Sequence, residues 1–231
     1  MNIEEFKKEL EKLNIILTGK QETQLETYYQ MLIETNKNMN LTGITEKEEV
    51  YLKHFYDSLT LAKAIDLTKP LKLIDIGTGA GFPGLVLKII FPNLEITLLD
   101  SLEKRLKFLD EVIEKLNLTN IKTVHSRIEE YKDERFDIVT SRAVAKTNIL
   151  LELSCQLVKI NGHFIFLKSN IEEELKESEK CLKTLNLILE EKIEFNLPKE
   201  NSKRTIIKIK KTKEISKQYP RNFAKIKKNP L

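Results

Sequence analysis

The chain is poor in the features that mark disulfide-rich, membrane-spanning and secreted proteins. It has no tryptophan, and its two cysteines, Cys155 and Cys181, form no C-x-x-C pair, so we expect both to be buried packing thiols in a cytoplasmic protein. Apolar stretches such as residues 85–91 are broken by Lys88 and fall well short of a membrane span of roughly 20 residues. Residues 1–17 are acidic and amphipathic, unlike a signal peptide. We therefore expect no membrane partner.

Glycine is scarce as well, which makes its distribution informative. Four of the seven glycines, Gly77, Gly79, Gly81 and Gly84, lie in the segment Asp-Ile-Gly-Thr-Gly-Ala-Gly-Phe-Pro-Gly, which starts at Asp75 and follows an apolar run with strand character. Glycine allows tight turns and lets a ligand approach main-chain N–H groups at the start of a helix. The segment therefore predicts a ligand-binding loop between a strand and a helix.

Two kinds of cofactor fit the pattern of this loop. From Gly79 to Gly84 it reads G-x-G-x-x-G, as dinucleotide-binding loops do. Asp75 would there lie near two phosphate charges, and at about 5 Å and an effective dielectric of about 20 each contact would cost roughly 3 kcal/mol. S-adenosylmethionine fits better, because Asp75 favours its ammonium and sulfonium groups while the N–H groups of glycines such as Gly77 and Gly79 hold its carboxylate.

A second acidic residue supports this cofactor. The apolar strand expected at 95–100 ends in Asp100, 23 residues beyond Gly77. An acid at that place can accept hydrogen bonds from both hydroxyls of a ribose. The alternative interpretation is that Asp75 and Asp100 only cap or turn the ends of their strands.

The net charge of +4 is unevenly distributed. Residues 199–231 contain twelve lysines and arginines against two glutamates, a net charge of +10, which leaves −6 for residues 1–198. A basic tail on an acidic body indicates a polyanionic partner, with phosphate contacts that depend on salt. The alternative is a solvated tail that only keeps the protein soluble.

Periodicity divides the chain into three regions. Residues 1–69 have helical spacing and predict an N-terminal helical layer packed on the core, with a capping box of Thr45 and Glu48 at its third helix. Residues 70–211 alternate strands with helices, which predicts an α/β domain with a parallel sheet covered on both faces. Residues 212–231 form the basic tail. The expected strands are 71–76, 95–100, 121–125, 136–140 and 162–168, the helices 84–91, 103–116, 147–159 and 171–185, and the final antiparallel hairpin 187–195 and 204–210.

This order is typical of the Rossmann-like class I methyltransferase sheet, in which the site lies across the carboxyl ends of the strands. Short motifs along most of the chain then resemble the RsmG family, once called GidB. Besides the glycine loop, they are Asp100-Ser101-Leu102-Glu103-Lys104-Arg105, Phe108-Leu109, Asn40-Leu41-Thr42, His54 with Asp57-Ser58-Leu59, Arg127-Ile128-Glu129-Glu130, Ser141-Arg142-Ala143, Tyr219-Pro220-Arg221 and Pro230-Leu231. The resemblance implies an S-adenosylmethionine-dependent methyltransferase that modifies N7 of a guanine in 16S ribosomal RNA. Its partner would be that RNA or a small-subunit ribonucleoprotein, and we expect a monomer.

The resemblance also implies which residues bind the cofactor. It assigns Arg142 to cofactor binding, and it places Ile128 and Glu129 against the adenine. Phe82, inside the glycine loop, is expected to line the site. The alternatives are that Arg142 is a surface arginine paired with a nearby acid, and that Glu129 is an ordinary acid at a helix start.

Positioning of the methyl acceptor is less defined by the sequence. Arg142 could bind guanine O6 or a phosphate. His54 shares one helix face with Asp57 and Ser58, and could face the acceptor pocket or be a structural histidine. Asn40 could orient the base or cap a helix. Phe55 and Tyr56 could stack on a splayed base, or pack in the core like most aromatic side chains.

The chain lacks the groups that other methyl acceptors need. Thr140-Ser141-Arg142-Ala143 stands where methyltransferases acting on exocyclic amines carry a polar residue, two prolines and an aromatic residue. Methylation of a pyrimidine carbon would need a thiolate, and neither cysteine is placed for it. Guanine N7 carries a free lone pair and needs only alignment, so we assign no acid–base residue and no metal ligand.

Some alternatives stay open at this stage. The same fold could act on another RNA or on a small molecule, or could bind cofactor or RNA without catalysis. In the tail, Ala224 and Ile226 stand where the RsmG family usually has Gly and Pro, which leaves its turn geometry open, while Lys225, Lys227 and Lys228 keep it basic. Which guanine is modified, and in which assembly state of the RNA, is not encoded in these motifs.

Overall fold

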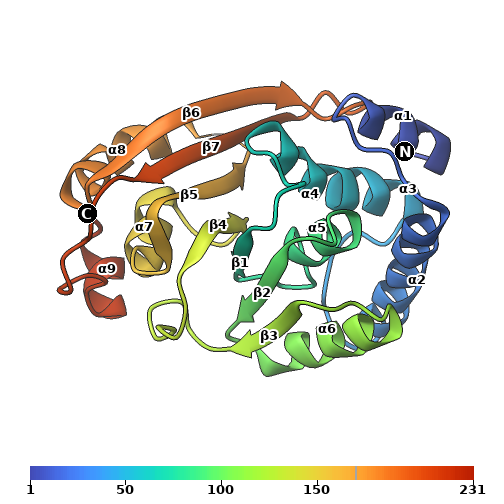
Figure 1. Cartoon of the computed structure of the whole chain (residues 1–231), viewed down its shortest axis with the longest axis horizontal. Coiled ribbons are helices and arrows are strands. Elements are labelled where there is room, and N and C mark those ends of the chain that lie inside the picture. Colours follow the sequence, from blue (N-terminus) through green and yellow to red (C-terminus); the bar gives the residue numbers. More distant parts are fainter. Residues whose placement is uncertain (170) are drawn as a thin grey trace.

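A seven-stranded sheet lies between two layers of helices in the computed structural model, which describes residues 1–169 and 171–231 (Figure 1). The strand order is β3-β2-β1-β4-β5-β7-β6. The strands are β1 (Lys72–Ile76), β2 (Glu95–Asp100), β3 (Ile121–His125), β4 (Phe136–Arg142), β5 (Val158–Lys168), β6 (Leu187–Asn196) and β7 (Lys203–Lys211). The predicted parallel sheet with a final antiparallel hairpin is confirmed.

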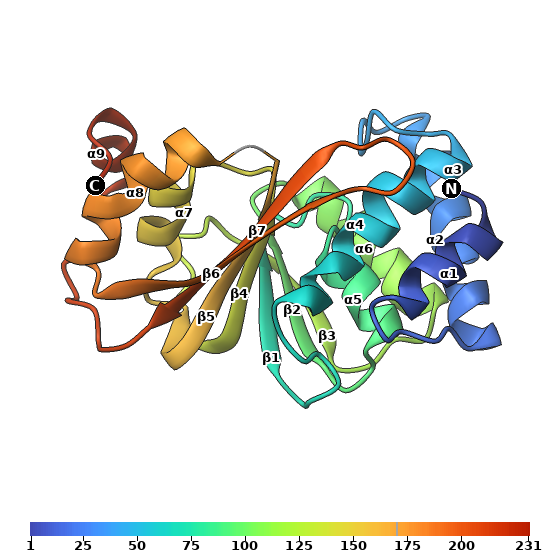
Figure 2. The ribbon, with the colours of Figure 1, turned by 90° about the horizontal axis from the view of Figure 1, so that it is seen from above.

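The central strands are apolar because both of their faces are covered. In β1 and β4 almost every residue is buried, as expected for parallel strands between helical layers. Helices α5 (Gly84–Ile90) and α6 (Glu103–Lys115) lie on one face with the N-terminal layer. Figure 2 shows that α7 (Thr147–Ser154), α8 (Glu172–Thr184) and α9 (Phe223–Lys228) lie on the other.

The N-terminal layer shares a hydrophobic core with the sheet. It comprises α1 (Ile3–Glu11), α2 (Gly19–Asn36), α3 (Lys47–Val50), a π-helical turn (Tyr51–Tyr56), α4 (Asp57–Leu59) and a 3₁₀ turn (Thr60–Lys63). Phe6, Tyr28 and Phe55 are fully buried and belong to the same cluster as Phe82 and Phe108 of the α/β domain. Aromatic rings bury large areas, so this cluster binds the layer firmly to the sheet.

The β6–β7 hairpin also contacts the N-terminal layer. Near its tip, Lys199 pairs with Glu5 at 2.5 Å and Glu200 pairs with Lys53 at 2.8 Å. The hairpin therefore spans from the α8 side of the sheet to the N-terminal layer, as Figure 2 shows. Within the described residues, no helix has both the length and the apolar character to cross a membrane.

Two expectations for local structure were wrong. α3 starts after Glu46 without a side-chain cap, so the capping box of Thr45 and Glu48 does not form. The boxes are instead Asn2 with Glu5 and Thr18 with Gln21, at the starts of α1 and α2.

The other error concerns the end of α7. This helix ends at Ser154 rather than at 159, and β5 begins at Val158 rather than at 162. Val158 already pairs with Phe136 at the start of β4, and this long-range pairing overrides the local helical spacing.

Candidate functional site

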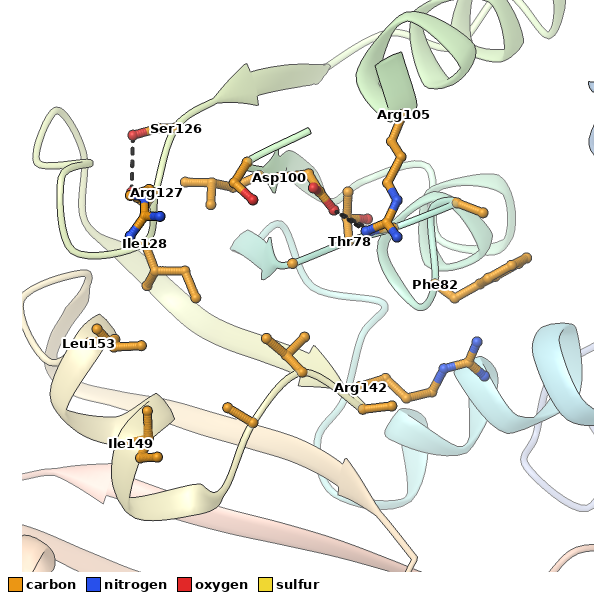
Figure 3. A pocket seen from close by; sticks show the side chains of 18 of the residues that line it. Thr78, Phe82, Asp100, Arg105, Ser126, Arg127, Ile128, Arg142, Ile149 and Leu153 are labelled. Atoms are coloured by element: carbon orange, nitrogen blue, oxygen red, sulfur yellow. Dashed lines mark hydrogen bonds and ion pairs between the residues drawn. The ribbon is translucent and has the colours of Figure 1, made fainter. Parts of the chain in front are cut away.

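A cavity of about 670 Å³ opens at the carboxyl ends of β1 to β4, within the range of roughly 300–1,000 Å³ that is typical of ligand sites. Its centre is where β1 has β2 on one side and β4 on the other, the point at which open α/β sheets bind ligands. Figure 3 shows its side chains converging from several loops. They are Leu41, Thr42, His54, Gly77, Thr78, Gly79, Ala80, Phe82, Leu99, Asp100, Ser101, Arg105, Ser126, Arg127, Ile128, Glu129, Arg142, Ala143, Val144, Ala145, Ile149, Leu153, Phe223 and Lys227.

Two glycines of the loop after β1 show why this residue type is needed there. Gly79 has φ +62° and lines the cavity, with no atom within 4 Å of where a Cβ would stand. Gly81 has φ +102°, and a Cβ there would lie 2.7 Å from the Tyr28 hydroxyl. That hydroxyl donates to the carbonyl of Ala80. Gly79 keeps the cavity open, and Gly81 lets α2 support the loop from behind.

Most N–H groups of the glycine loop are already bonded within the protein. Those of Gly77 and Thr78 donate to the carbonyl of Leu99, at 2.8 and 3.0 Å, and the N–H of Gly79 donates to Asp100 Oδ2 at 2.9 Å. The N–H of Gly84 donates to Asp75 at 2.9 Å. The expected cradle of glycine N–H groups around a ligand carboxylate is therefore not formed in this structure; these bonds shape the loop instead.

Asp75 lies behind the loop, and it does not line the cavity. Its carboxylate is fully buried and accepts hydrogen bonds from Thr78 Oγ1 at 2.7 Å and from the N–H of Gly84. Burial raises its pKa to about 6, against the lowering effect of those two bonds. Asp75 therefore has a structural role in the loop instead of the expected direct contact with a cationic ligand. Because its carboxylate does not face the cavity, it would also repel a pyrophosphate there less than expected from the sequence.

Asp100 does line the cavity, at the end of β2. It is 3% exposed, and its two oxygens accept from the N–H groups of Gly79 and Leu102, both at 2.9 Å. Arg105 approaches it at 3.5 Å. A carboxylate has about four acceptor positions, and the two backbone bonds leave about two for ligand hydroxyls, one of them shared with the long Arg105 contact. Fixed by two backbone bonds, Asp100 is pre-oriented to accept them.

Arg142 is bound to the N-terminal layer rather than free. Its guanidinium donates to the carbonyl of Lys53 at 2.8 Å, to Asp57 Oδ2 at 3.2 Å and to His54 Nδ1 at 3.1 Å. Asp57 also accepts from Arg204 of β7 at 3.2 Å. The alternative interpretation of Arg142, an arginine paired with a nearby acid, is right about the pairing, but the side chain is 14% exposed and lines the cavity.

His54 is neutral and held in one orientation. Its ring stacks on Phe82 with centroids 4.4 Å apart. Because Arg142 donates to Nδ1, Nε2 carries the proton and donates to Thr42 Oγ1 at 2.8 Å. Burial, with the Arg142 charge, lowers its pKa to about 3. His54 therefore lines the cavity as a neutral side chain with both nitrogens engaged.

The loop after β3 closes the opposite end of the cavity. Ile128 and Glu129 line it, as the resemblance implied, and Ile149 and Leu153 of α7 add an apolar wall. Figure 3 shows Ile128, Ile149 and Leu153 far from Phe82 and Arg142, with Asp100 between the two groups. The cavity thus has a polar end and an apolar end.

Other predicted residues lie elsewhere. Asn40 is exposed and outside the cavity lining; its suggested capping role belongs to Asn36, whose Oδ1 accepts from the N–H groups of Leu41 and Thr42. Phe55 and Tyr56 are packed in the core. Thr42 was missed, although it stands in one of the quoted motifs.

The two cysteines lie in the core, as expected. Cys155 and Cys181 are both buried as free thiols, and burial raises the pKa of each to about 12. A thiol with such a pKa is not a nucleophile at neutral pH.

The basic tail is not simply solvated. Ile226 and Leu231 are buried, and Arg221 forms a double ion pair with the fully buried Glu152. Phe223 and Lys227 of α9 line the cavity. The long-range ion pair was invisible in the sequence, because nothing in α7 signals that its glutamate is buried.

Comparison with known proteins places the chain in a family. A model of the GidB family, described as rRNA small subunit methyltransferase G, matches residues 21–207. The chain is 48% identical to the Ribosomal RNA small subunit methyltransferase G of Bacillus velezensis, with 100% of this chain and 99% of the relative covered. It is also 48% identical to the protein of that name from Levilactobacillus brevis, with the same coverage. The chain belongs to the GidB family.

Solved structures with a similar fold are methyltransferases. A methyltransferase from Pyrococcus furiosus matches with a TM-score of 0.58 at 16% identity, covering 83% of this chain and 98% of that one. A SAM-dependent O-methyltransferase from Thermotoga maritima matches with a TM-score of 0.53 at 19% identity, covering 80% of this chain and 73% of that one. At these identities the likeness shows the class I methyltransferase fold alone.

Proposed function

We propose that this member of the GidB family transfers a methyl group from S-adenosylmethionine to N7 of a guanine in 16S ribosomal RNA. The observation that carries the proposal is the cavity at the carboxyl ends of β1 to β4, with a fixed carboxylate at its centre and, among the described lining residues, no side chain poised to take a proton at its polar end. The names of the relatives point to the same substrate class.

The cavity fits S-adenosylmethionine in shape and in chemistry. Asp100 has free lone pairs for the two ribose hydroxyls, while Ile128 and Leu153 offer an apolar wall for a purine. Open space beside Gly79 leaves room for a ligand against the loop. This cofactor supplies a methyl group already activated by a sulfonium, so the protein has only to align donor and acceptor and to exclude water.

The polar end favours an acceptor that needs no base. With its pKa near 3 and its Nδ1 bonded to Arg142, His54 cannot take a proton at neutral pH. Asp100 and Glu129, the two carboxylates in the described lining, lie at the centre and in the β3 loop. Guanine N7 has an in-plane lone pair and no proton, so it can be methylated there without proton transfer.

An RNA partner is supported by positive charge on α9 and at the cavity lining. Lys225, Lys227 and Lys228 of α9 are exposed and form no ion pair within the described residues. Arg105 and Arg127 also lie at the lining. Such cations can bind phosphates on either side of a base that has entered the cavity. We place the reaction in the cytoplasm, where small-subunit RNA is assembled.

The test uses purified protein, S-adenosylmethionine with a labelled methyl group, and small-subunit RNA or subunits from cells that lack the protein. Mass spectrometry of the digested nucleosides should find the label in 7-methylguanosine. Label in another nucleoside would contradict the N7 assignment. Tight binding of the cofactor without transfer to either RNA substrate would favour a non-catalytic module.

A further inference from the structure

Helix α7 carries two different functions on neighbouring faces. Ile149 and Leu153, four residues apart, line the apolar end of the cavity. Asn148 and Glu152, also four apart, and Gln156 just beyond the helix bind the C-terminal segment. Residues four apart lie on one side of a helix. The wall of the cavity and the anchor of the tail are therefore parts of one rigid element.

The anchor centres on an ion pair. Glu152 is fully buried and accepts from Arg221 Nε and Nη2, both at 2.6 Å, and from the Arg221 N–H at 3.2 Å. Arg221 Nη2 also donates to the carbonyl of Asn229, beyond the end of α9. A bidentate contact fixes both distance and direction. Arg221 therefore holds the start of α9 on α7 and its end close by.

Further contacts hold the tail on either side of this pair. Gln156 Nε2 donates to the carbonyls of Ile215, Ser216 and Tyr219, at 3.0 to 3.3 Å. At the other side, Asn148 Nδ2 donates to the carbonyl of Leu231 at 3.3 Å, and the Leu231 side chain is buried. The segment is thus fixed along its length, which accounts for the Tyr-Pro-Arg and Pro-Leu motifs without any contact to RNA.

This anchoring brings one aromatic side chain to the cavity. Phe223, the first residue of α9, lines the apolar end and is 37% exposed. The guanidinium of Arg127 lies 5.4 Å from the centre of its ring. Arg127 directly precedes Ile128, which lines the same end. An exposed aromatic ring at the edge of a cavity offers a flat apolar surface to a ligand.

We propose that α9 forms the purine-binding wall of the cavity, with Phe223 contacting the adenine of the cofactor. The inference rests on the proposed function and goes beyond it, because it makes the C-terminal helix part of the cofactor site in addition to a carrier of cations for RNA. The purine is adenine rather than the target guanine, because Phe223 stands beside the β3 loop. The polar end at Arg142 and Phe82 is left for the acceptor.

The experiment is calorimetric titration of the full-length protein with S-adenosylhomocysteine in the absence of RNA. Phe223→Ala should bind about tenfold more weakly than the unmodified protein, the effect of removing one aromatic side chain that stacks on a base. Phe223→Trp should restore most of the affinity. Ile188→Ala, at an exposed apolar residue of β6 remote from the cavity lining, is the matched control and should bind normally.

The outcomes separate the two proposals. If Phe223→Ala binds S-adenosylhomocysteine as tightly as the unmodified protein, the inference is overturned, even if its KM for RNA rises, because that result would place the ring against the guanine. If the unmodified protein fails to bind S-adenosylhomocysteine, the proposed function itself fails. Circular dichroism of the variants checks that the fold is intact, which we expect for an exposed side chain.

Discussion

The two ends of the cavity are built in different ways. At the polar end, Arg142, Asp57 and His54 are held by ion pairs and hydrogen bonds and are largely shielded from water. At the apolar end, Phe223 and Ile128 contribute side-chain surface, and Phe223 is 37% exposed. The polar end therefore contributes mainly to the stability of the fold, whereas the apolar end contributes mainly to ligand affinity.

The difference follows from the elements that supply each end. The polar end joins three distant segments, because Asp57 of α4 bonds Arg142 of β4 and Arg204 of β7. Breaking these ion pairs would leave charged side chains without partners at a site that water barely reaches. The apolar end depends on contact area, which can be reduced at small cost where the side chain is already partly in water.

The largest expected effect is on stability at the polar end. Asp57→Ala leaves Arg142 and Arg204 without their shared partner, and loss of one member of a buried ion pair costs roughly 3–5 kcal/mol. Urea denaturation should show this loss, against Glu179→Ala, an exposed acid without an ion pair in the described chain, as control. Phe223→Ala should change the free energy of unfolding by less than about 0.5 kcal/mol. Equal losses for Asp57→Ala and Phe223→Ala would remove the distinction between the two ends.

The next effect is a pH dependence contributed by His54. Its pKa is lowered to about 3 in the folded protein, so between pH 6.5 and 3 the unfolded chain binds the proton more tightly and stability is lost as pH falls. From pH 7.5 to 5 this one residue should cost the unmodified protein up to about 2 kcal/mol. His54→Gln should lack this loss.

The free energy of unfolding is measured for the unmodified protein and for His54→Gln at pH 7.5 and at pH 5. The difference between the two proteins at one pH is then compared with their difference at the other. Asp75 acts in the opposite direction, because its raised pKa of about 6 favours the folded state as pH falls toward 4. Both proteins contain Asp75, so its contribution cancels in the difference. A difference that does not change with pH would mean that His54 has the same pKa in the folded and the unfolded protein, and that burial does not lower it.

A smaller effect on stability is expected at the centre of the cavity. Gly79→Ala places a methyl group in open space but in a left-handed conformation, which costs roughly 1–2 kcal/mol. Because that methyl group occupies the cavity, affinity for S-adenosylhomocysteine should fall more than stability does. Gly19→Ala, at the first residue of α2 with nothing near its Cβ, is the control. Unchanged ligand affinity in Gly79→Ala would show that the ligand does not approach the loop.

The smallest effect per residue is expected at the lysines of α9, of which Lys227 also lines the cavity. Replacing Lys225, Lys227 and Lys228 with Gln should flatten the salt dependence of RNA binding, by up to about 0.7 in the log–log slope for each phosphate that a lysine no longer neutralises. Filter binding at several salt concentrations measures the slope. An unchanged slope would indicate that α9 serves the cavity alone.

The sequence was sufficient for the parts of the site that depend on local pattern. Asp100 and Phe82 line the cavity as expected, because the strand before Asp100 and the glycine loop around Phe82 carry strong local signals, whereas Ile128 and Arg142 were expected there from the family resemblance. Asp75 shows the limit of this approach. Its place near the end of β1 was readable, but whether its side chain pointed into the cavity or toward α5 depended on packing around Gly84.

Long-range polar contacts could not be predicted in the same way. The pairing of Glu152 with Arg221 joins residues 69 positions apart, and it brings a basic tail that was expected to meet a polyanion to the lining of the cavity. The pairing of Arg142 with Asp57 spans 85 positions. The charge of the tail could be counted from the sequence, but its position beside the cavity depends on Glu152, an acid of α7 that is distant in the sequence.

Methylation of small-subunit RNA in which 7-deazaguanine replaces guanine tests the assignment of the reaction to N7 most sharply. That base keeps the shape and the pairing edge of guanine but lacks the N7 lone pair, and the polar end, as far as its residues are described, offers no base to activate another atom. With unmodified RNA, the labelled methyl group should appear in 7-methylguanosine. With the substituted RNA no label should be transferred, and transfer at a comparable rate would contradict methylation at N7.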